Sequence, residues 1–131
     1  MAYPVTVEWR EHGEPVAVAC SDDLSHLLDR IALESEPDRP PLVIVTNEGG
    51  SLTIGVGAPV STLNHVLPSN DPPYMICLGD ADAEGVIDFY IAGHHSQFLM
   101  RNTIPNGSAR AAALEYAESG KLPDSVVWEE V

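Results

Sequence analysis

The stretch LVIVTNEGGSLTIGV, residues 42–56, decides the fold class of this chain. Its first five residues form an apolar, mostly β-branched run that is typical of a central strand. The residues NEGG at 47–50 predict a turn, and the alternating residues 51–56 predict a second strand that pairs back as a hairpin. An antiparallel sheet is therefore the expected centre of the molecule.

Two strands and a helix are predicted before this hairpin. Residues 5–9 alternate between apolar and polar side chains, with Val5, Val7 and Trp9 inward, and after a turn at 11–14 a second strand covers 15–20. Ser21 is a favourable N-cap for a helix over about 22–35, and two aspartates in its first turn suit the helix dipole. This helix is expected to bury four residues at helical spacing: Leu24, Leu27, Leu28 and Ile31.

The second half adds strands and one more helix. Residues 57–73 contain four prolines and little periodicity, which predicts a loop that can hold a short helical turn near Leu63. Strands are expected at 74–78, 86–91 and 126–129. A helix is expected from Pro105, at its first position, to about Ser119. The prediction is a single domain over 1–131 of the α+β class, with a mostly antiparallel mixed sheet of about six or seven short strands and two helices packed on one face.

Charge narrows the classes of partner. The 131 residues include 20 acidic and 6 basic side chains, so the formal net charge is −14. Unaided binding to nucleic acid or to an anionic membrane needs a basic surface, so neither is expected, and a cationic partner fits better. No apolar run reaches the roughly 18 residues of a membrane span, and no signal peptide is recognised, so a cytoplasmic location is expected. Cys20 and Cys77 then predict buried, reduced thiols.

No residue pattern predicts a catalytic centre, a metal site or a cofactor. The acidic run DADAEG at 80–85 copies the opening of a calcium loop, but its twelfth position is Ile91, where the motif needs Glu. An acidic turn is the better interpretation. His94 and His95 are adjacent, so on a strand their imidazoles point to opposite faces and do not share one metal.

The C-terminal part of the chain carries a family resemblance. It contains DFYIAGHHSQF at 88–98, an alanine-rich helix after Pro105, ESGKLP at 118–123 and VWEE at 127–130. This pattern resembles the first-numbered family of immunity proteins from bacterial polymorphic toxin systems. The match lies mainly in residues 74–131, and in the first half only the order of elements agrees. The matching residues are expected to set turns, caps and core: Gly93, Pro105, Gly120, Pro123 and Trp128.

The resemblance implies a small cytosolic inhibitor made beside a toxin, without catalytic residues of its own. Toxins linked to this family are often nucleic-acid deaminases. Such a toxin presents a basic substrate channel, which an acidic protein can meet and block. We expect the toxin-binding surface to include the acidic turn, the outward face of the following strand and the region around Gly93: Asp80, Asp82, Glu84, Asp88, Tyr90, His94, His95, Gln97 and Arg101. The free protein is expected to be a monomer or a weak homodimer paired through an edge strand near the C-terminus.

Two other functions stay open on the sequence. One is a small metal-dependent hydrolase that uses the histidines and the acidic turn, which requires those groups to converge on one pocket. The other is a generic acidic adaptor for many basic proteins, which promiscuous binding would distinguish from an inhibitor of one toxin.

Overall fold

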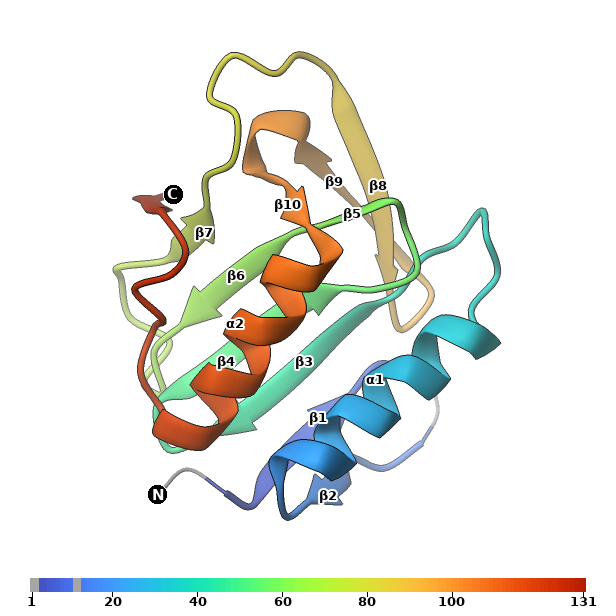
Figure 1. The fold of residues 1–131 in the computed structure, drawn as a ribbon, viewed down its shortest axis with the longest axis vertical. Helices are drawn as coiled ribbons and strands as arrows, with labels where there is room; N and C mark the ends of the chain where they lie inside the picture. The colour runs from blue at the N-terminus through green and yellow to red at the C-terminus, as the bar shows by residue number, and fades with distance from the viewer. Residues whose placement is uncertain (1–2, 11–12) are drawn as a thin grey trace.

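The computed structural model describes residues 3–10 and 13–131, and an antiparallel sheet runs through this part of the chain (Figure 1). Within the described residues the sheet has seven strands in the order β11-β7-β6-β4-β3-β1-β2. The hairpin predicted from residues 42–56 is confirmed and lies near its middle. The strands of this sheet are β1 (Val5–Glu8), β2 (Val16–Val18), β3 (Leu42–Asn47), β4 (Gly50–Gly55), β6 (Leu63–Val66), β7 (Met75–Cys77) and β11 (Trp128–Glu130).

Two helices, α1 (Ser21–Glu34) and α2 (Asn106–Ser119), lie side by side over one face of the sheet (Figure 1). The four residues predicted for the apolar stripe of α1 are all buried. On α2 the buried face consists of alanines and Tyr116, which lets the helix approach the sheet closely. The α+β fold with both helices on one face is therefore confirmed.

A second hairpin, β8 (Val86–Ile91) and β9 (His94–Leu99), forms a separate two-stranded sheet. It docks through Phe89, which is fully buried with its ring against Gly55, and through the Tyr90 N–H, which donates to the Pro40 carbonyl at 2.9 Å. The sequence does not predict β9, because its polar residues hide the strand pattern. A third small sheet pairs β5 (Val60–Ser61) with β10 (Ile104–Pro105), and the 3-10 helix η1 (Met100–Asn102) lies between β9 and β10.

The loop predicted over residues 57–73 is wrong, because β5 and β6 lie within it. Strand β6 is internal to the main sheet, where Leu63 pairs with Ile54 and His65 with Leu52. His65 is buried: its Nε2 lies 3.0 Å from the Gly49 carbonyl oxygen, and its ring meets Tyr116 edge-on at 5.3 Å between centroids. Because His65 is polar but points inward, residues 63–66 do not show the alternation of apolar and polar side chains that identifies a strand in the sequence.

The predicted N-termini of both helices are wrong by one residue, whereas the predicted C-terminal glycine of α2 is confirmed. Ser21 is the first residue of α1 and Cys20 takes the N-cap position, with no side-chain capping bond, so Ser21 is not the cap. Pro105 precedes α2 as its N-cap instead of opening it. Gly120 ends α2 as predicted, in the left-handed conformation at φ 75°, with its N–H donating to the Tyr116 carbonyl at 2.8 Å.

The prediction that both thiols are buried is wrong for Cys20, which is exposed, whereas Cys77 is buried as predicted. It follows the three-residue edge strand β2, where the chain leaves the sheet to enter α1. Of the turn predicted at 11–14, residues 11 and 12 lie outside the described part of the chain.

Candidate functional site

The β8–β9 hairpin brings together four of the predicted site residues. Its register pairs Asp88 with Gln97 and Tyr90 with His95, so these side chains share one face. The third pair on the same face joins Val86 and Leu99. We call these six residues the outer hairpin face. The opposite face carries Phe89 and Phe98, whose rings meet edge-on at 6.0 Å between centroids, and it packs toward the main sheet.

Polar contacts order the middle of the outer hairpin face. The Asp88 Oδ1 accepts hydrogen bonds from His95 Nε2 at 2.8 Å and from Gln97 Nε2 at 3.2 Å. These bonds, the one from His95 foremost, lower the pKa of the Asp88 carboxyl below its ordinary value. The Tyr90 ring lies 5.4 Å from the His95 ring, and the Arg39 guanidinium lies 5.6 Å from the Tyr90 ring centre. These contacts link the side chains in the middle of the outer hairpin face to one another.

Val86 and Leu99 form an apolar pair at the open end of this hairpin. They are 52% and 53% exposed, among the few large hydrophobic side chains that the described residues leave in solvent. The alternation of residues 86–91 places Val86 outward, but nothing in the sequence indicates that Leu99 lies opposite it. Sequence reasoning therefore missed this pair, which only the strand register shows.

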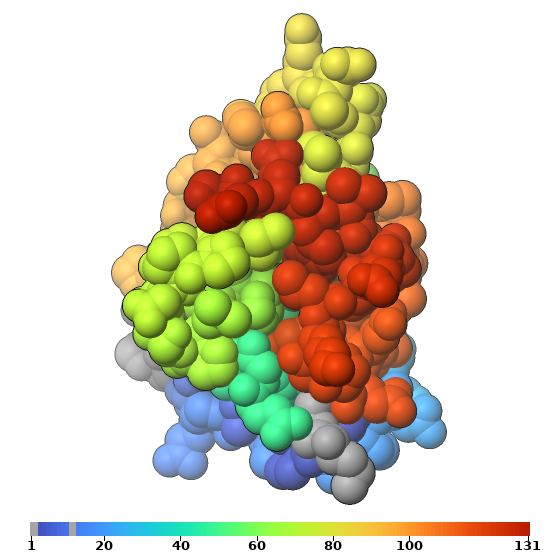
Figure 2. All heavy atoms as spheres, turned by 90° about the vertical axis from the view of Figure 1, so that its left-hand side faces the viewer, coloured from blue at the N-terminus to red at the C-terminus, as the bar shows by residue number. Residues whose placement is uncertain are grey.

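The acidic turn of residues 79–85 adjoins the apolar pair. Asp80, Asp82 and Glu84 are exposed, and the Asp80 carboxylate accepts the Asp82 N–H at 2.9 Å. The segment around residue 80 projects from one end of the molecule as a yellow knob in Figure 2. Both ends of the turn are tied down, by the Gly79 N–H to the Arg101 carbonyl at 2.8 Å and by the Met100 N–H to the Gly85 carbonyl at 3.0 Å.

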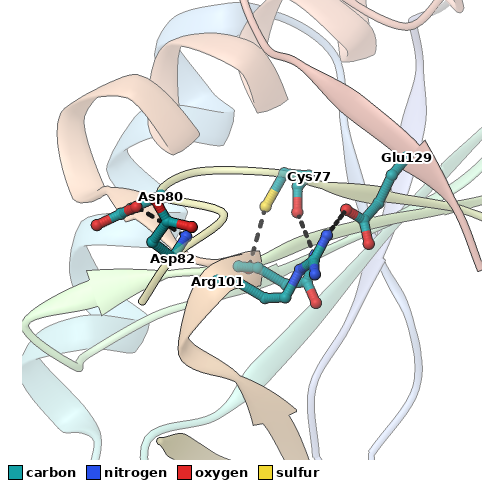
Figure 3. A network of polar contacts seen from close by, with 6 residues as sticks. Cys77, Asp80, Asp82, Arg101 and Glu129 are labelled. Carbon is teal, nitrogen blue, oxygen red and sulfur yellow. Dashed lines mark hydrogen bonds and ion pairs between the residues drawn. The ribbon is translucent and has the colours of Figure 1, made fainter. Parts of the chain in front are cut away.

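Polar contacts near the turn involve Arg101, the only arginine among the predicted site residues (Figure 3). Its guanidinium donates to the Glu129 carboxylate of β11 at 2.8 Å, with the two side chains 39% and 31% exposed. Beside this pair, the Cys77 thiol donates to the Asn102 carbonyl at 3.3 Å, and the Asn102 amide donates to the Cys77 carbonyl at 3.0 Å. Burial raises the pKa of the Cys77 thiol. Arg101 thus joins β11 to the base of the turn and lies off the outer hairpin face.

The two adjacent histidines point apart, as strand geometry predicts. His95 lies on the outer hairpin face, whereas His94 pairs with Ile91 on the other side of the hairpin. Within residues 3–10 and 13–131, no three His, Cys, Asp or Glu side chains are grouped so that they could hold a metal ion. The convergence that a metal-dependent hydrolase requires is therefore not seen in this part of the chain.

The C-terminal residues that carry the family resemblance connect the end of α2 to the edge strand β11 of the main sheet. Pro123 is buried, and its carbonyl accepts the Trp128 indole N–H at 3.0 Å. Trp128 is partly buried against the core and pairs with Cys77 across β11 and β7. Gly93 lies in the tight turn between β8 and β9 at φ 84°, a conformation that favours glycine. The tail thus connects α2 to the strand beneath the acidic turn.

The part of the chain that contains the acidic turn and β8–β9 is rich in acidic residues and lacks Lys and Arg. No Lys or Arg occurs between residues 40 and 100, whereas that stretch holds six acids: Glu48, Asp71, Asp80, Asp82, Glu84 and Asp88. Three of the arginines outside it form ion pairs of their own, with Glu34, Glu129 and Asp29. The acidic turn therefore belongs to a segment without a basic residue of its own.

Comparison with protein families gives a match to the family model of Immunity protein Imm1 over residues 12–130. The chain belongs to the Imm1 family. The Imm1 match extends well beyond the tail that carries the resemblance in the sequence and includes the first helix, the β8–β9 hairpin and every strand of the main sheet except β1. Comparison with curated proteins gave no match. None of the helices in the described residues is long and apolar enough to cross a membrane.

Proposed function

We propose that this Imm1 protein binds one cognate toxin domain, encoded beside it, and neutralises that toxin. The observation that carries the proposal is the Imm1 match over residues 12–130. The proposed protein is a cytoplasmic inhibitor and not an enzyme, and it needs no cofactor.

The proposed toxin acts on nucleic acid, as a deaminase does. A toxin of this class needs basic residues along its substrate channel, because it must hold a phosphate backbone. A protein with a net charge of −14 is attracted to such a surface and competes with the polyanionic substrate for it. Inhibition on this proposal is occlusion of the channel by an acidic surface.

The proposed contact surface is the acidic turn together with the outer hairpin face. Its acids are exposed, and its polar side chains are held in place by contacts within the hairpin, so little side-chain freedom is lost on binding. His94 lies outside this surface, on the opposite side of the hairpin next to its tip, and Arg101 lies at the base of the turn in an ion pair with Glu129.

Co-expression with the neighbouring toxin domain tests the function. We expect the two proteins to co-elute in size-exclusion chromatography at moderate salt, with loss of toxin activity in the complex. Persistence of the complex at high salt would indicate a buried apolar anchor, whereas loss at high salt alone would indicate mainly exposed ionic contacts. Absence of a complex under both conditions would contradict the proposal.

Unrelated basic proteins serve as the control for the adaptor alternative. An inhibitor of one toxin should leave them unbound at the concentration that saturates its cognate toxin. Equal binding to several of them would instead support a generic acidic adaptor. The uncomplexed protein should elute as a monomer or as a weak dimer paired through the edge strand β11.

A further inference from the structure

The exposed apolar pair on the outer hairpin face has no structural role that its surroundings explain. Val86 and Leu99 face each other across β8 and β9, with about half of each residue exposed, while the core contacts of the hairpin are made by Phe89 on its opposite face. Cross-strand apolar pairs stabilise a hairpin only modestly relative to alanine. The next pair on the same face, Asp88 and Gln97, is polar and hydrogen-bonded. An exposed position of this hairpin therefore does not require apolar side chains.

We infer that Val86 and Leu99 are the apolar anchor of the toxin interface and that the acidic turn forms the charged rim beside them. This inference rests on the proposed function and specifies where on the surface the toxin binds. Protein interfaces concentrate binding energy in a few desolvated apolar side chains surrounded by polar residues. The hairpin shows this arrangement: the apolar pair has Asp88 on one side and, directly before Val86 in the chain, the turn with Glu84 on the other.

Charge complementarity selects the occupant. Four acids, at 80, 82, 84 and 88, lie close to Val86 along the chain, and no Lys or Arg occurs between 40 and 100. Of the cations that adjoin this stretch, Arg101 is paired with Glu129, and Arg39 lies over Tyr90 at the other end of the outer hairpin face. A partner that covers Val86 and Leu99 must therefore place its own rim over an acidic surface, which favours Lys and Arg there. The basic channel of a nucleic-acid-acting toxin has that chemistry.

The size of the hairpin sets the extent of the contact. Six residues of antiparallel strand span roughly 20 Å, and two strands with their side chains cover a width of about 10 Å. A stable interface usually buries about 800 Å² on each partner. The outer hairpin face alone is smaller than this, so the toxin must also contact the turn of residues 79–85, which leads directly into the start of β8 (Figure 1).

Other exposed apolar residues provide matched controls. Val127, beside the edge strand β11, is 64% exposed, and Leu33 on α1 is 85% exposed. They repeat the residue types of the proposed anchor at other places on the surface. The pair Val127→Ser/Leu33→Ser therefore has the same composition change and the same net charge as Val86→Ser/Leu99→Ser.

The experiment measures the affinity of each variant for the neighbouring toxin domain by calorimetry or biolayer interferometry. We expect Val86→Ser/Leu99→Ser to bind at least about 100-fold more weakly than the wild type, about tenfold for each lost anchor residue, mainly through faster dissociation. The control pair should bind within about threefold of the wild type. Far-UV circular dichroism and thermal unfolding establish that each variant is folded before it is used.

Hydrogen exchange of the wild-type complex gives an independent measurement that needs no variant. We expect slowed exchange at backbone amides of residues 80–99 when the toxin is bound. Wild-type affinity in the Val86→Ser/Leu99→Ser variant, or protection confined to the Val127 and Leu33 regions, would overturn the anchor while leaving the immunity function standing. A wild-type protein that does not bind the toxin at all would overturn the proposed function, and the anchor with it.

Discussion

At the scale of single residues, the two cysteines occupy opposite environments. Cys20 is exposed before α1, whereas Cys77 is fully buried, accepts the Leu63 N–H at 3.2 Å and has a pKa raised by burial. Because the thiolate is the reactive form, we expect Ellman's reagent to modify Cys20 quickly in the folded protein and Cys77 only on unfolding. The variant Cys20→Ser should then show no fast reaction. A fast thiol remaining in that variant would contradict the burial of Cys77.

Asp88 provides a prediction about pH. Hydrogen bonds from His95 and, second, from Gln97 hold the pKa of the carboxyl below its ordinary value of 3.8. The folded state thus favours the carboxylate, so the stability it contributes is present above the ordinary pKa and is lost as pH falls through the lowered one. We expect His95→Ala/Gln97→Ala to raise the pKa toward 3.8 in an NMR titration. The distant variant His26→Ala should leave it unchanged, and an unchanged pKa in the double variant would contradict the assignment.

At the scale of elements, apolar patterning was informative where inward positions are apolar. It predicted β3, β4 and the buried stripe of α1, because those segments fill the core with Val, Leu and Ile. It failed at β6, where His65 occupies an inward position, and at β9, where half of the strand faces solvent and its register is set by pairing with β8. The register between paired strands is a property of the folded chain that the pattern within one strand does not contain.

The docking of the second hairpin depends on one glycine. A Cβ at Gly55 would lie 2.5 Å from the Phe89 ring, which supplies its three nearest atoms, and φ there needs no glycine, so Gly55→Ala acts mainly through this contact. We expect it to lower the free energy of unfolding by about 1–3 kcal/mol, measured by urea denaturation. Gly107→Ala is the control: nothing lies within 4 Å of its Cβ, and in α2 alanine should stabilise by about 0.5–1 kcal/mol.

A double variant separates this contact from a general effect of the substitution. Phe89→Leu shortens the side chain that the new methyl group would meet, so Gly55→Ala/Phe89→Leu should lose less stability than the two single losses combined. Strict additivity would show that Phe89 does not hold the hairpin against Gly55. The same comparison followed by hydrogen exchange should show faster exchange in β8 and β9 than in β3 and β4 for Gly55→Ala.

At the scale of the whole molecule, the sequence predicted the family, and it named candidate site residues without their arrangement in space. It indicated Asp88, Tyr90, His95 and Gln97, and the strand register does place them on one face. It also indicated Arg101, whose guanidinium donates to the carboxylate of Glu129, a residue of β11 that lies 28 residues later in the chain. The sequence did not indicate the Arg101–Glu129 contact or the Val86–Leu99 pair, because local patterns do not show which residues pair across strands.

Net charge gives the last prediction, on the kinetics of association. A triple variant of the turn, Asp80→Asn/Asp82→Asn/Glu84→Gln, removes three charges where we propose the toxin binds. Exposed acids at the far end of α2 and beyond it provide a control with the same charge change: Glu115→Gln/Glu118→Gln/Asp124→Asn. Both variants reduce the net charge of −14 equally, so any difference between them reports position and not total charge.

We expect the turn variant to associate with the toxin roughly tenfold more slowly at low salt, and the control variant to associate at nearly the wild-type rate. Dissociation should change little in either, because exposed charges steer the encounter while the apolar anchor sets the lifetime. The difference should shrink as ionic strength rises and the screening length falls below about 10 Å. Stopped-flow or surface-based kinetics at several salt concentrations measure both rates. Equal slowing by the two variants would mean that the toxin responds only to the net charge of the molecule, and the turn would then have no special place in recognition.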